Sequence, residues 1–208
     1  SYGVKGDIAR LKIGAALNLL LGGIPSIYYG QEIGMSGTNA SLGATDANDI
    51  PNRSAFDWYK SGKGKGMDYW YKQKGPWKDK FETDKPNDGI SLEEQADDPN
   101  SLWNFYREML NLRKANPVLI GGAYKTLTNN NDQVFSFQRT ENGKRIVIAV
   151  NLSERNQDVA IQFAGKETKL NQLHGIVKAA IVPPTKAGDP NTIKLNMAPN
   201  GIEVWGLE

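Results

Sequence analysis

Hydrophobic residues recur at helical spacing between Asp7 and Leu21, directly before the glycine pair Gly22-Gly23. The apolar positions fall on both sides of such a helix, which favours a buried helix over a half-exposed one. Asp7 is a suitable N-cap residue, and glycines favour the left-handed backbone that commonly ends a helix. The pattern therefore predicts a buried helix over residues 7–21.

A short apolar run follows from Ile24 to Tyr29, and it is continuous rather than alternating. A continuous run of this length is typical of a parallel strand that is covered on both faces. Pro25 fits only the start of such a strand, where no ladder donor is needed. A helix, a short turn and a buried strand together predict an α/β architecture.

Residues 36–97 lose this periodicity, and Gly, Asn, Asp and Lys dominate them. Disordered segments are poor in aromatic residues, so the aromatic content here favours an ordered, functional excursion from the fold. The segment ends in an acidic cluster of Glu93, Glu94, Asp97 and Asp98. Because the cluster leads into a helix N-terminus, we expect it to cap that helix rather than to bind a metal.

A second helical pattern extends from Asp98, an expected N-cap, through Pro99 at the first helical position, to a stop at Asn116-Pro117. Beyond Leu119 the pattern changes to short strands, with a strong hairpin signal at Asn142-Gly143. We therefore predict an antiparallel sandwich of seven or eight strands, with a domain boundary near residue 118. The two predicted domains are residues 1–118 and 119–208.

The composition excludes several classes of function. A formal charge of +2 over 208 residues gives no electrostatic basis for binding nucleic acid or an anionic membrane. The absence of cysteine excludes disulfides, thiolate zinc sites and a cysteine nucleophile.

No apolar run approaches the roughly 18 residues of a membrane-spanning helix. No secretory leader precedes the first helix, so we expect either a cytoplasmic protein or one whose natural start lies upstream, and the compartment stays unknown.

Three ordered motifs resemble the α-amylase family of glycoside hydrolases. Residues 23–35, "GIPSIYYGQEIGM", resemble the family's motif on the eighth barrel strand. Residues 52–58, "NRSAFDW", resemble its R-x-P-F/M-x-W motif, with Ala55 in place of the usual proline. Residues 98–124 resemble the last barrel helix and the entry into the family's β-sandwich domain. The resemblance covers essentially the whole chain.

The resemblance implies an α/β plus all-β fold: the last helix-strand-helix segment of a (β/α)8 barrel, followed by an antiparallel β-sandwich C-terminal domain. It implies an enzyme that hydrolyses or transfers α-glucosidic bonds in starch-like oligosaccharides through two carboxylates. The family's R-x-D and N-H-D motifs do not occur in this sequence, nor does its catalytic glutamate motif. The resemblance therefore implies a C-terminal portion with no catalytic residue, no metal ligand and no cofactor, inactive alone, with calcium as a candidate ion of the complete enzyme.

Glu32 has two possible roles. It is either a general acid at the end of a barrel strand or a scaffold residue. The resemblance favours a scaffold role, in which its carboxylate accepts hydrogen bonds that fix the following loop. The same structural motif contains Gly23, Pro25, Tyr28 and Gly30.

The candidates for contact with substrate are Gln31, Arg53 and Trp58. Alternatively, the arginine anchors the long loop and the tryptophan fills a small core within it.

Two other classes of function stay open. One is a non-catalytic carbohydrate-binding module that uses Trp58, Trp70 and Trp77, and the other is an interaction scaffold derived from the same family. The expected partners are an α-glucan or maltooligosaccharide and the remainder of the barrel. An isolated strand at residues 24–29 would expose unpaired edges, so we expect the chain alone to self-associate there or to leave this segment poorly ordered.

Overall fold

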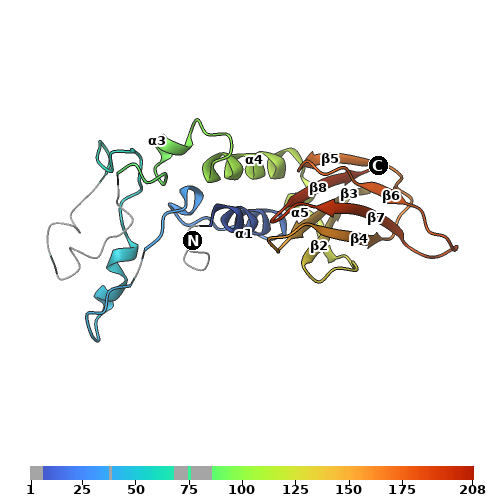
Figure 1. Ribbon diagram of the computed structural model, residues 1–208, viewed down its shortest axis with the longest axis horizontal. Coiled ribbons are helices and arrows are strands. Elements are labelled where there is room, and N and C mark those ends of the chain that lie inside the picture. Colours follow the sequence, from blue (N-terminus) through green and yellow to red (C-terminus); the bar gives the residue numbers. More distant parts are fainter. Residues whose placement is uncertain (1–6, 38, 68–74, 76–85) are drawn as a thin grey trace. The chain divides into compact units, whose positions relative to one another are not determined.

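The computed structural model describes residues 7–37, 39–67, 75 and 86–208 (Figure 1). The chain divides into two compact units, which are described separately. The first unit comprises Ser1–Lys12 and Ser26–Glu108, and the second comprises Ile13–Pro25 and Met109–Glu208. The predicted boundary at residue 118 stays a prediction. Among the residues described, no helix is both long and apolar enough to cross a membrane.

The helical elements are short apart from two. They are α1 (Ile8–Leu20), the 3-10 helices η1 (Gln31–Ile33) and η2 (Asp46–Asn52), α3 (Leu92–Gln95), α4 (Leu102–Ala115) and α5 (Val118–Gly121). The predicted first helix is confirmed, because the Oδ1 atom of Asp7 accepts a hydrogen bond from the Arg10 amide at 3.2 Å and Gly22 and Gly23 follow the last turn with positive φ. Its buried side chains lie only in the second half, from Ile13 onward.

The prediction of a strand at residues 24–29 is wrong for this chain. The segment has no strand partner among the described residues, and its backbone is irregular. Ile24 is 98% exposed and Tyr28 is 64% exposed, although the pattern predicted burial on both faces. A parallel strand is stabilised by hydrogen bonds to neighbouring strands, so an apolar run that lacks them stays without regular structure.

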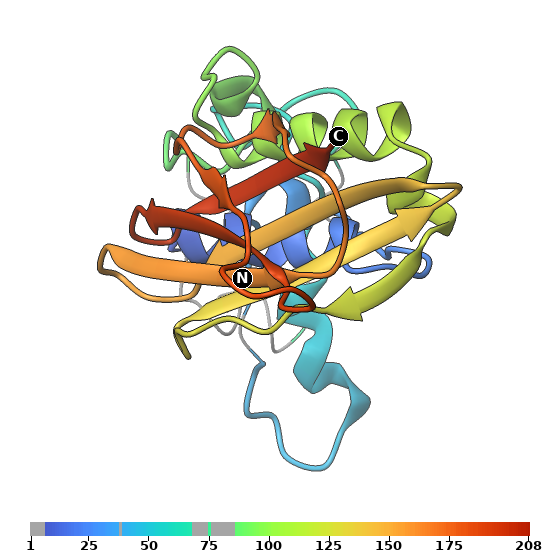
Figure 2. The same ribbon diagram turned by 90° about the vertical axis from the view of Figure 1, so that its right-hand side faces the viewer.

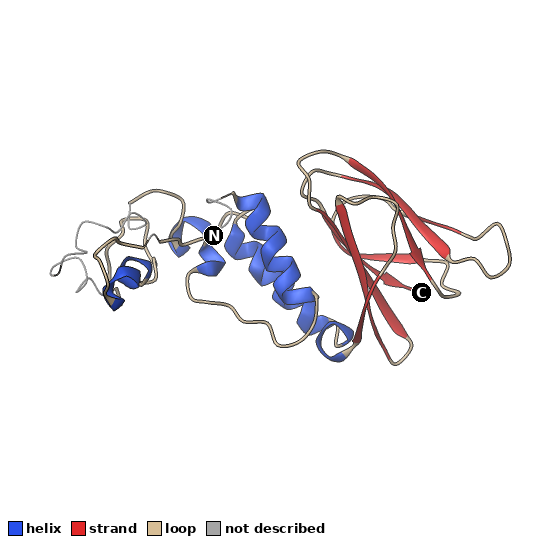
Figure 3. Ribbon diagram, turned by 90° about the horizontal axis from the view of Figure 1, so that it is seen from below, coloured by secondary structure: helices blue, strands red, loops and turns tan. Residues whose placement is uncertain are grey.

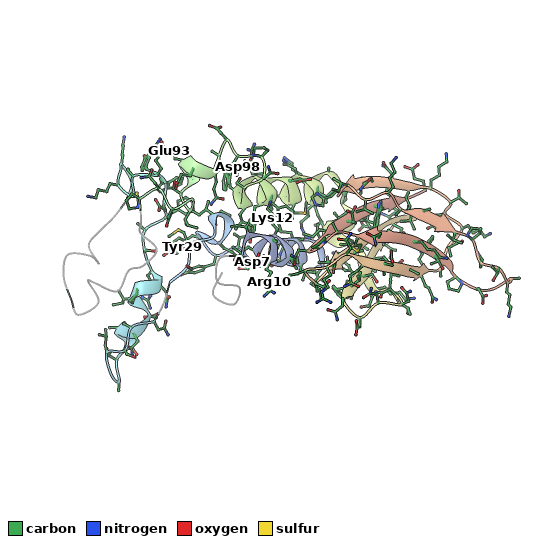
Figure 4. All side chains as sticks on the ribbon, viewed as in Figure 1. Asp7, Arg10, Lys12, Tyr29, Glu93 and Asp98 are labelled. Atoms are coloured by element: carbon green, nitrogen blue, oxygen red, sulfur yellow. The ribbon has the colours of Figure 1, made fainter. Side chains whose placement is uncertain are left out.

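The start of the second predicted helix also differs. α4 begins at Leu102, and the Ser101 hydroxyl accepts a hydrogen bond from the Asn104 amide at 3.1 Å, which is an N-cap contact. Asp98 instead accepts from the Asn100 amide at 2.8 Å and so shapes the turn before the helix (Figure 4). Glu94 forms a capping box with Ser91 at the start of α3, which is not the helix that the acidic cluster was expected to cap.

The second unit holds the predicted sandwich of eight strands, within residues 123–207 that the structure describes throughout (Figures 2 and 3). The strands form a five-stranded sheet in the order β1-β2-β3-β8-β5 and a three-stranded sheet in the order β4-β7-β6, and all pairs are antiparallel. Their bounds are β1 Ala123–Thr126, β2 Val134–Glu141, β3 Lys144–Asn151, β4 Gln157–Phe163, β5 Leu170–His174, β6 Ala180–Val182, β7 Asn191–Met197 and β8 Ile202–Leu207.

The hydrophobic core of the sandwich lies between these two sheets. It contains Val147, Ile161, Ile193 and Trp205, with further side chains from β3, β4, β7 and β8. The predicted hairpin at Asn142-Gly143 is confirmed, because β2 pairs with β3 up to Glu141 opposite Lys144 and both turn residues have positive φ. Two consecutive residues with positive φ are typical of a type I′ turn, which asparagine and glycine favour.

Two buried arginines bind the end of α1. The Arg113 guanidinium donates to the carbonyls of Leu19, Leu119 and Gly23 at 2.6–2.8 Å. The Arg139 guanidinium donates to the carbonyls of Leu20, Leu119 and Gly122 at 2.6–3.2 Å. The last carbonyls of a helix have no partner within the helix and carry its negative dipole end. Both cations therefore stabilise the C-terminus of α1.

Candidate functional site

A pocket of about 220 Å³ lies in the first unit, around the turn that follows Tyr29. It is lined by Tyr28, Tyr29, Gln31, Met35, Ser36, Gly37, Asn52 and Ser54. The motif of residues 23–35 supplies the first four of these, and the segment that begins at Asn52 supplies the last two. Two of the three motifs found in the sequence thus meet at one pocket.

Glycine at position 30 makes the turn under this pocket. Gly30 has a φ of 81°, and the Met35 amide donates to its carbonyl at 2.8 Å. A Cβ atom at this position would lie 2.5 Å from the Sδ atom and 2.9 Å from the Cβ atom of Met35. Only glycine fits this backbone without moving Met35, which lines the pocket.

We expect Gly30→Ala to destabilise the first unit by about 2 kcal/mol, roughly half from the positive φ and the rest from the displaced methionine. Gly23→Ala is the matched control, because Gly23 has a φ of 73° and open space around the added Cβ. Amide hydrogen exchange at Met35 measures the effect, since this amide binds the Gly30 carbonyl. Equal exchange rates in the two variants would contradict the role assigned to the Met35 contact.

Gln31 is held in one orientation by both ends of its amide. Its Nε2 atom donates to the Tyr106 hydroxyl at 2.8 Å, and its Oε1 atom accepts from the Tyr28 amide at 3.3 Å. Burial raises the pKa of Tyr106 above its ordinary value, so its phenol stays neutral at physiological pH. The structure thus places Gln31 in the pocket wall, where its role in substrate binding stays a prediction.

The two tyrosines form the aromatic side of the pocket. The rings of Tyr28 and Tyr29 lie 4.9 Å apart between centroids, tilted by 38°. The Tyr29 hydroxyl donates to the Ser54 carbonyl at 3.0 Å, which links the two motifs. Burial raises the pKa of Tyr29, so this donor keeps its proton. Tyr28 is largely exposed and presents an aromatic face of the kind that packs on apolar surfaces of ligands.

Arg53 and Trp58 do not line this pocket. The Arg53 guanidinium is exposed and pairs with the Asp49 carboxylate one helical turn earlier, which raises the pKa of Arg53. The Trp58 ring packs on Phe56 at 4.5 Å between centroids, and its carbonyl accepts from the Glu93 amide. Trp58 is 43% exposed. The roles of Arg53 and Trp58, in substrate binding or in stabilising the loop, stay predictions. Trp70 and Trp77 lie outside the described residues.

Glu32 lies in η1, and its Oε2 atom is buried without a hydrogen-bond partner among the described residues. The loop after η1 is held instead by Gln95, whose Nε2 atom donates to the Ile33 carbonyl at 2.7 Å. The same amide group accepts from the Trp103 amide at 3.1 Å, so one buried side chain joins η1 to the start of α4. The scaffold role of Glu32 stays a prediction.

Sequence reasoning missed Asn52, Ser54 and Gln95. The motif at residues 52–58 drew attention to its charged and aromatic members, but the residues on either side of Arg53 line the pocket. Gln95 follows two glutamates in "LEEQ" and carries no signal in the sequence.

The pocket offers stacking and hydrogen bonding but no acid or base. No carboxylate or imidazole is among its lining residues. Within the described ranges, no three His, Cys, Asp or Glu side chains gather in a way that could hold a metal ion. This geometry fits the wall of a binding cleft for a neutral, polyhydroxylated ligand.

Comparison with known proteins identifies the family. The sequence pattern described as "Alpha amylase, catalytic domain" matches residues 3–122, which is more than half of the chain. The chain belongs to the α-amylase family. A second pattern, "Alpha-amylase C-terminal domain", matches residues 122–204. Together they confirm the predicted fold class, part of an α-amylase barrel followed by a β-sandwich domain.

Individual members of the α-amylase family support this assignment. Alpha-amylase 3 of Dictyoglomus thermophilum is 28% identical over 71% of this chain, and the trehalose synthase of Thermus thermophilus is 27% identical over 98% of it. The crystal structure of the alpha-amylase from H. orenii superposes with a TM-score of 0.67 and 25% identity over 99% of the chain. The chain spans only 26%, 20% and 36% of these three proteins.

Proposed function

We propose that these residues are the C-terminal part of an enzyme that hydrolyses or transfers α-glucosidic bonds in starch-like oligosaccharides. The family assignment supports the reaction class, and the names of the relatives include an alpha-amylase, a trehalose synthase and an oligo-1,6-glucosidase. The nucleophile, the acid/base and the stabilising aspartate would come from other parts of the enzyme, since the three family motifs that carry them do not occur in this sequence.

The pocket around Tyr28 and Gln31 carries the proposal for this chain. We infer that it forms part of the wall that binds sugar, with Tyr28 packing on a pyranose face and Gln31 donating to or accepting from hydroxyls. The observation that supports this most directly is the fixed amide of Gln31 between Tyr106 and the Tyr28 backbone. A preorganised polar group loses less conformational entropy when it binds a ligand.

The exposed segment at residues 24–29 fits the same proposal. Its apolar side chains include Ile24 and Ile27, which are exposed in this chain. In the proposed enzyme, the remainder of the barrel would cover these side chains and supply the neighbouring strands. Self-association of the isolated chain through this segment stays a prediction on the same physical basis.

The test compares variants of the complete enzyme of which these 208 residues are the proposed C-terminal part. We expect Tyr28→Ala and Gln31→Ala each to raise KM for maltotriose by about tenfold with a smaller change in kcat, because each removes a contact made to bound substrate. Tyr28→Phe keeps the ring and should retain most of the affinity, and Gln133→Ala is a control at an exposed glutamine of the sandwich.

An unchanged KM in both variants would contradict the proposal that this pocket is part of the substrate cleft. The purified chain of 208 residues should not hydrolyse an aryl α-glucoside. Hydrolysis at a rate that survives Glu32→Gln would contradict the proposal that the catalytic carboxylates lie elsewhere.

A further inference from the structure

The sequence contains two Asn-Gly pairs, Asn142-Gly143 and Asn200-Gly201, and both belong to the second unit. An asparagine before a glycine can lose ammonia, because the backbone nitrogen of the glycine can attack the side-chain carbonyl carbon. Glycine has no Cβ atom to hinder this ring closure, and its backbone is the most flexible. Both asparagines have a positive φ, 49° at Asn142 and 52° at Asn200. The two pairs therefore share the same local chemistry and differ in their surroundings.

Asn142-Gly143 is the two-residue turn of the hairpin between β2 and β3, and both residues are exposed. The Gly143 amide donates no hydrogen bond to the residues that the structure describes, and an added Cβ atom would have open space around it. Only the pair of Glu141 and Lys144 closes the turn. The last pair of a hairpin opens at little cost in free energy, so the Gly143 nitrogen can reach the Asn142 side chain.

Asn200-Gly201, in the turn between β7 and β8, is held by hydrogen bonds on both sides. The Gly201 amide donates to the Ala198 carbonyl at 3.0 Å, and the Asn200 amide donates to the Ser153 carbonyl at 2.9 Å. The Gly201 carbonyl accepts from the Asn151 amide, also at 2.9 Å. Ring closure at Asn200 therefore requires a larger opening of the fold, because the attacking nitrogen must first leave its acceptor.

The side-chain carbonyl of Asn200 is also less suited to the reaction. Its Oδ1 atom is buried and has no hydrogen-bond partner among the described residues. Attack on the carbonyl carbon places a negative charge on this oxygen, and a buried charge without a donor is strongly unfavourable. Asn142 is exposed, so water can solvate the same charge there. Two features of the fold thus protect Asn200 and are missing at Asn142.

We propose that Asn142 is a site of spontaneous deamidation and that the fold protects Asn200 from the same reaction. The Gly143 nitrogen gives its proton to water or hydroxide and forms a bond to the Asn142 Cγ atom. The bond from Cγ to Nδ2 breaks, and Nδ2 leaves as ammonia after taking a proton from water. Water then opens the succinimide ring at either carbonyl and yields aspartate or isoaspartate. The net change consumes one water molecule and releases one ammonia molecule.

The isoaspartate product would change the hairpin itself. It adds one carbon atom to the backbone between Asn142 and Gly143, so the turn no longer has the geometry that places Glu141 opposite Lys144. Both products also add a negative charge next to Glu141. Because β3 lies between β2 and β8 in the five-stranded sheet, the modification would weaken pairing at one end of a central strand.

The test follows both asparagines in the 208-residue chain during incubation at mildly alkaline pH. Peptide mass spectrometry detects the exchange of an amide for a carboxyl group, and chromatography separates isoaspartate from aspartate. Synthetic peptides of residues 139–146 and 196–204 give the two rates without the fold. We expect Asn142 in the chain to react within about tenfold of its peptide, and Asn200 to react at least a hundredfold, in order of magnitude about two decades, more slowly than its peptide.

Urea at a concentration that unfolds the chain provides the control. It should bring Asn200 to about the rate of its peptide and leave Asn142 close to the rate it already has, because reaction through an open state follows the population of that state. Equal slowing of the two asparagines in the folded chain would overturn the proposal, as would an unmodified Asn142 in a chain whose Asn200 has reacted. Neither asparagine lines the pocket at Tyr28 and Gln31, so the result is independent of the function proposed for that pocket.

Discussion

Replacing Arg139 by methionine is expected to lower the free energy of unfolding by about 3–5 kcal/mol, because it leaves the buried carbonyls of Leu20 and Gly122 without a side-chain donor. Arg139 is 2% exposed, and its guanidinium binds the carbonyls of Leu20, Leu119 and Gly122. Methionine fills a similar volume, so the loss would come from the hydrogen bonds and from the charge near the helix C-terminus rather than from a cavity.

The charge environment of Arg139 makes this cluster unusual. Burial lowers the pKa of Arg139, and the neighbouring cation of Arg113 lowers it further. Two like charges lie close together here because each faces the carbonyls at the end of α1 rather than a carboxylate. Arg139→Lys keeps the charge but loses the planar fork that reaches several carbonyls at once. We therefore expect its stability to lie between that of the methionine variant and the wild type.

Urea unfolding followed by far-ultraviolet circular dichroism measures these differences. Arg155→Met is the matched control, because Arg155 is exposed in the turn after β3, and it should change stability by less than about 0.5 kcal/mol. A methionine variant at position 139 that unfolds at the same urea concentration as this control would show that the carbonyls find other donors or water.

The fold was largely predictable because local signals agree with one another in most elements. The hairpin at Asn142-Gly143 combines turn chemistry with alternating strands, and Asp7 with Gly22 marks both ends of α1. The segment at residues 24–29 could not be predicted in the same way. Its apolar pattern encodes burial against neighbouring strands, and those neighbours are not among the described residues, so the pattern and the local structure differ.

Only those residues of the site that lie in the recognised motifs could be predicted from the sequence. The resemblance drew attention to Gln31 and to the segment around Arg53, and the structure places Gln31 in the pocket wall. The role of Gln95 depends on a hydrogen bond to the carbonyl of Ile33, 62 residues earlier in the chain. A glutamine in an otherwise ordinary helix or strand carries no periodic or compositional signal, so such contacts need the three-dimensional structure.

Gly175→Val is expected to destabilise the sandwich by about 3 kcal/mol, because it disrupts the contacts of a buried carboxylate. Glu203 in β8 is 2% exposed, and its carboxylate accepts hydrogen bonds from the amides of Ile176 and Val177 at 3.2 Å and from Gln172 at 3.0 Å. Burial raises the pKa of Glu203, and these donors oppose the rise. A Cβ atom on Gly175, whose φ is 96°, would overlap the Glu203 carboxylate.

Gly188→Val separates the two causes of this loss. Gly188 has a φ of 97° and no atom within 4 Å of an added Cβ, so it retains the backbone strain without the overlap. We expect this control to lose only about 1–2 kcal/mol, measured by urea unfolding of both variants. Combining Gly175→Val with Glu203→Ala should then show a favourable coupling, since the double variant no longer forces a carboxylate away from its donors. Equal losses in the two valine variants, together with strictly additive effects, would show that the loop after β5 does not depend on Glu203.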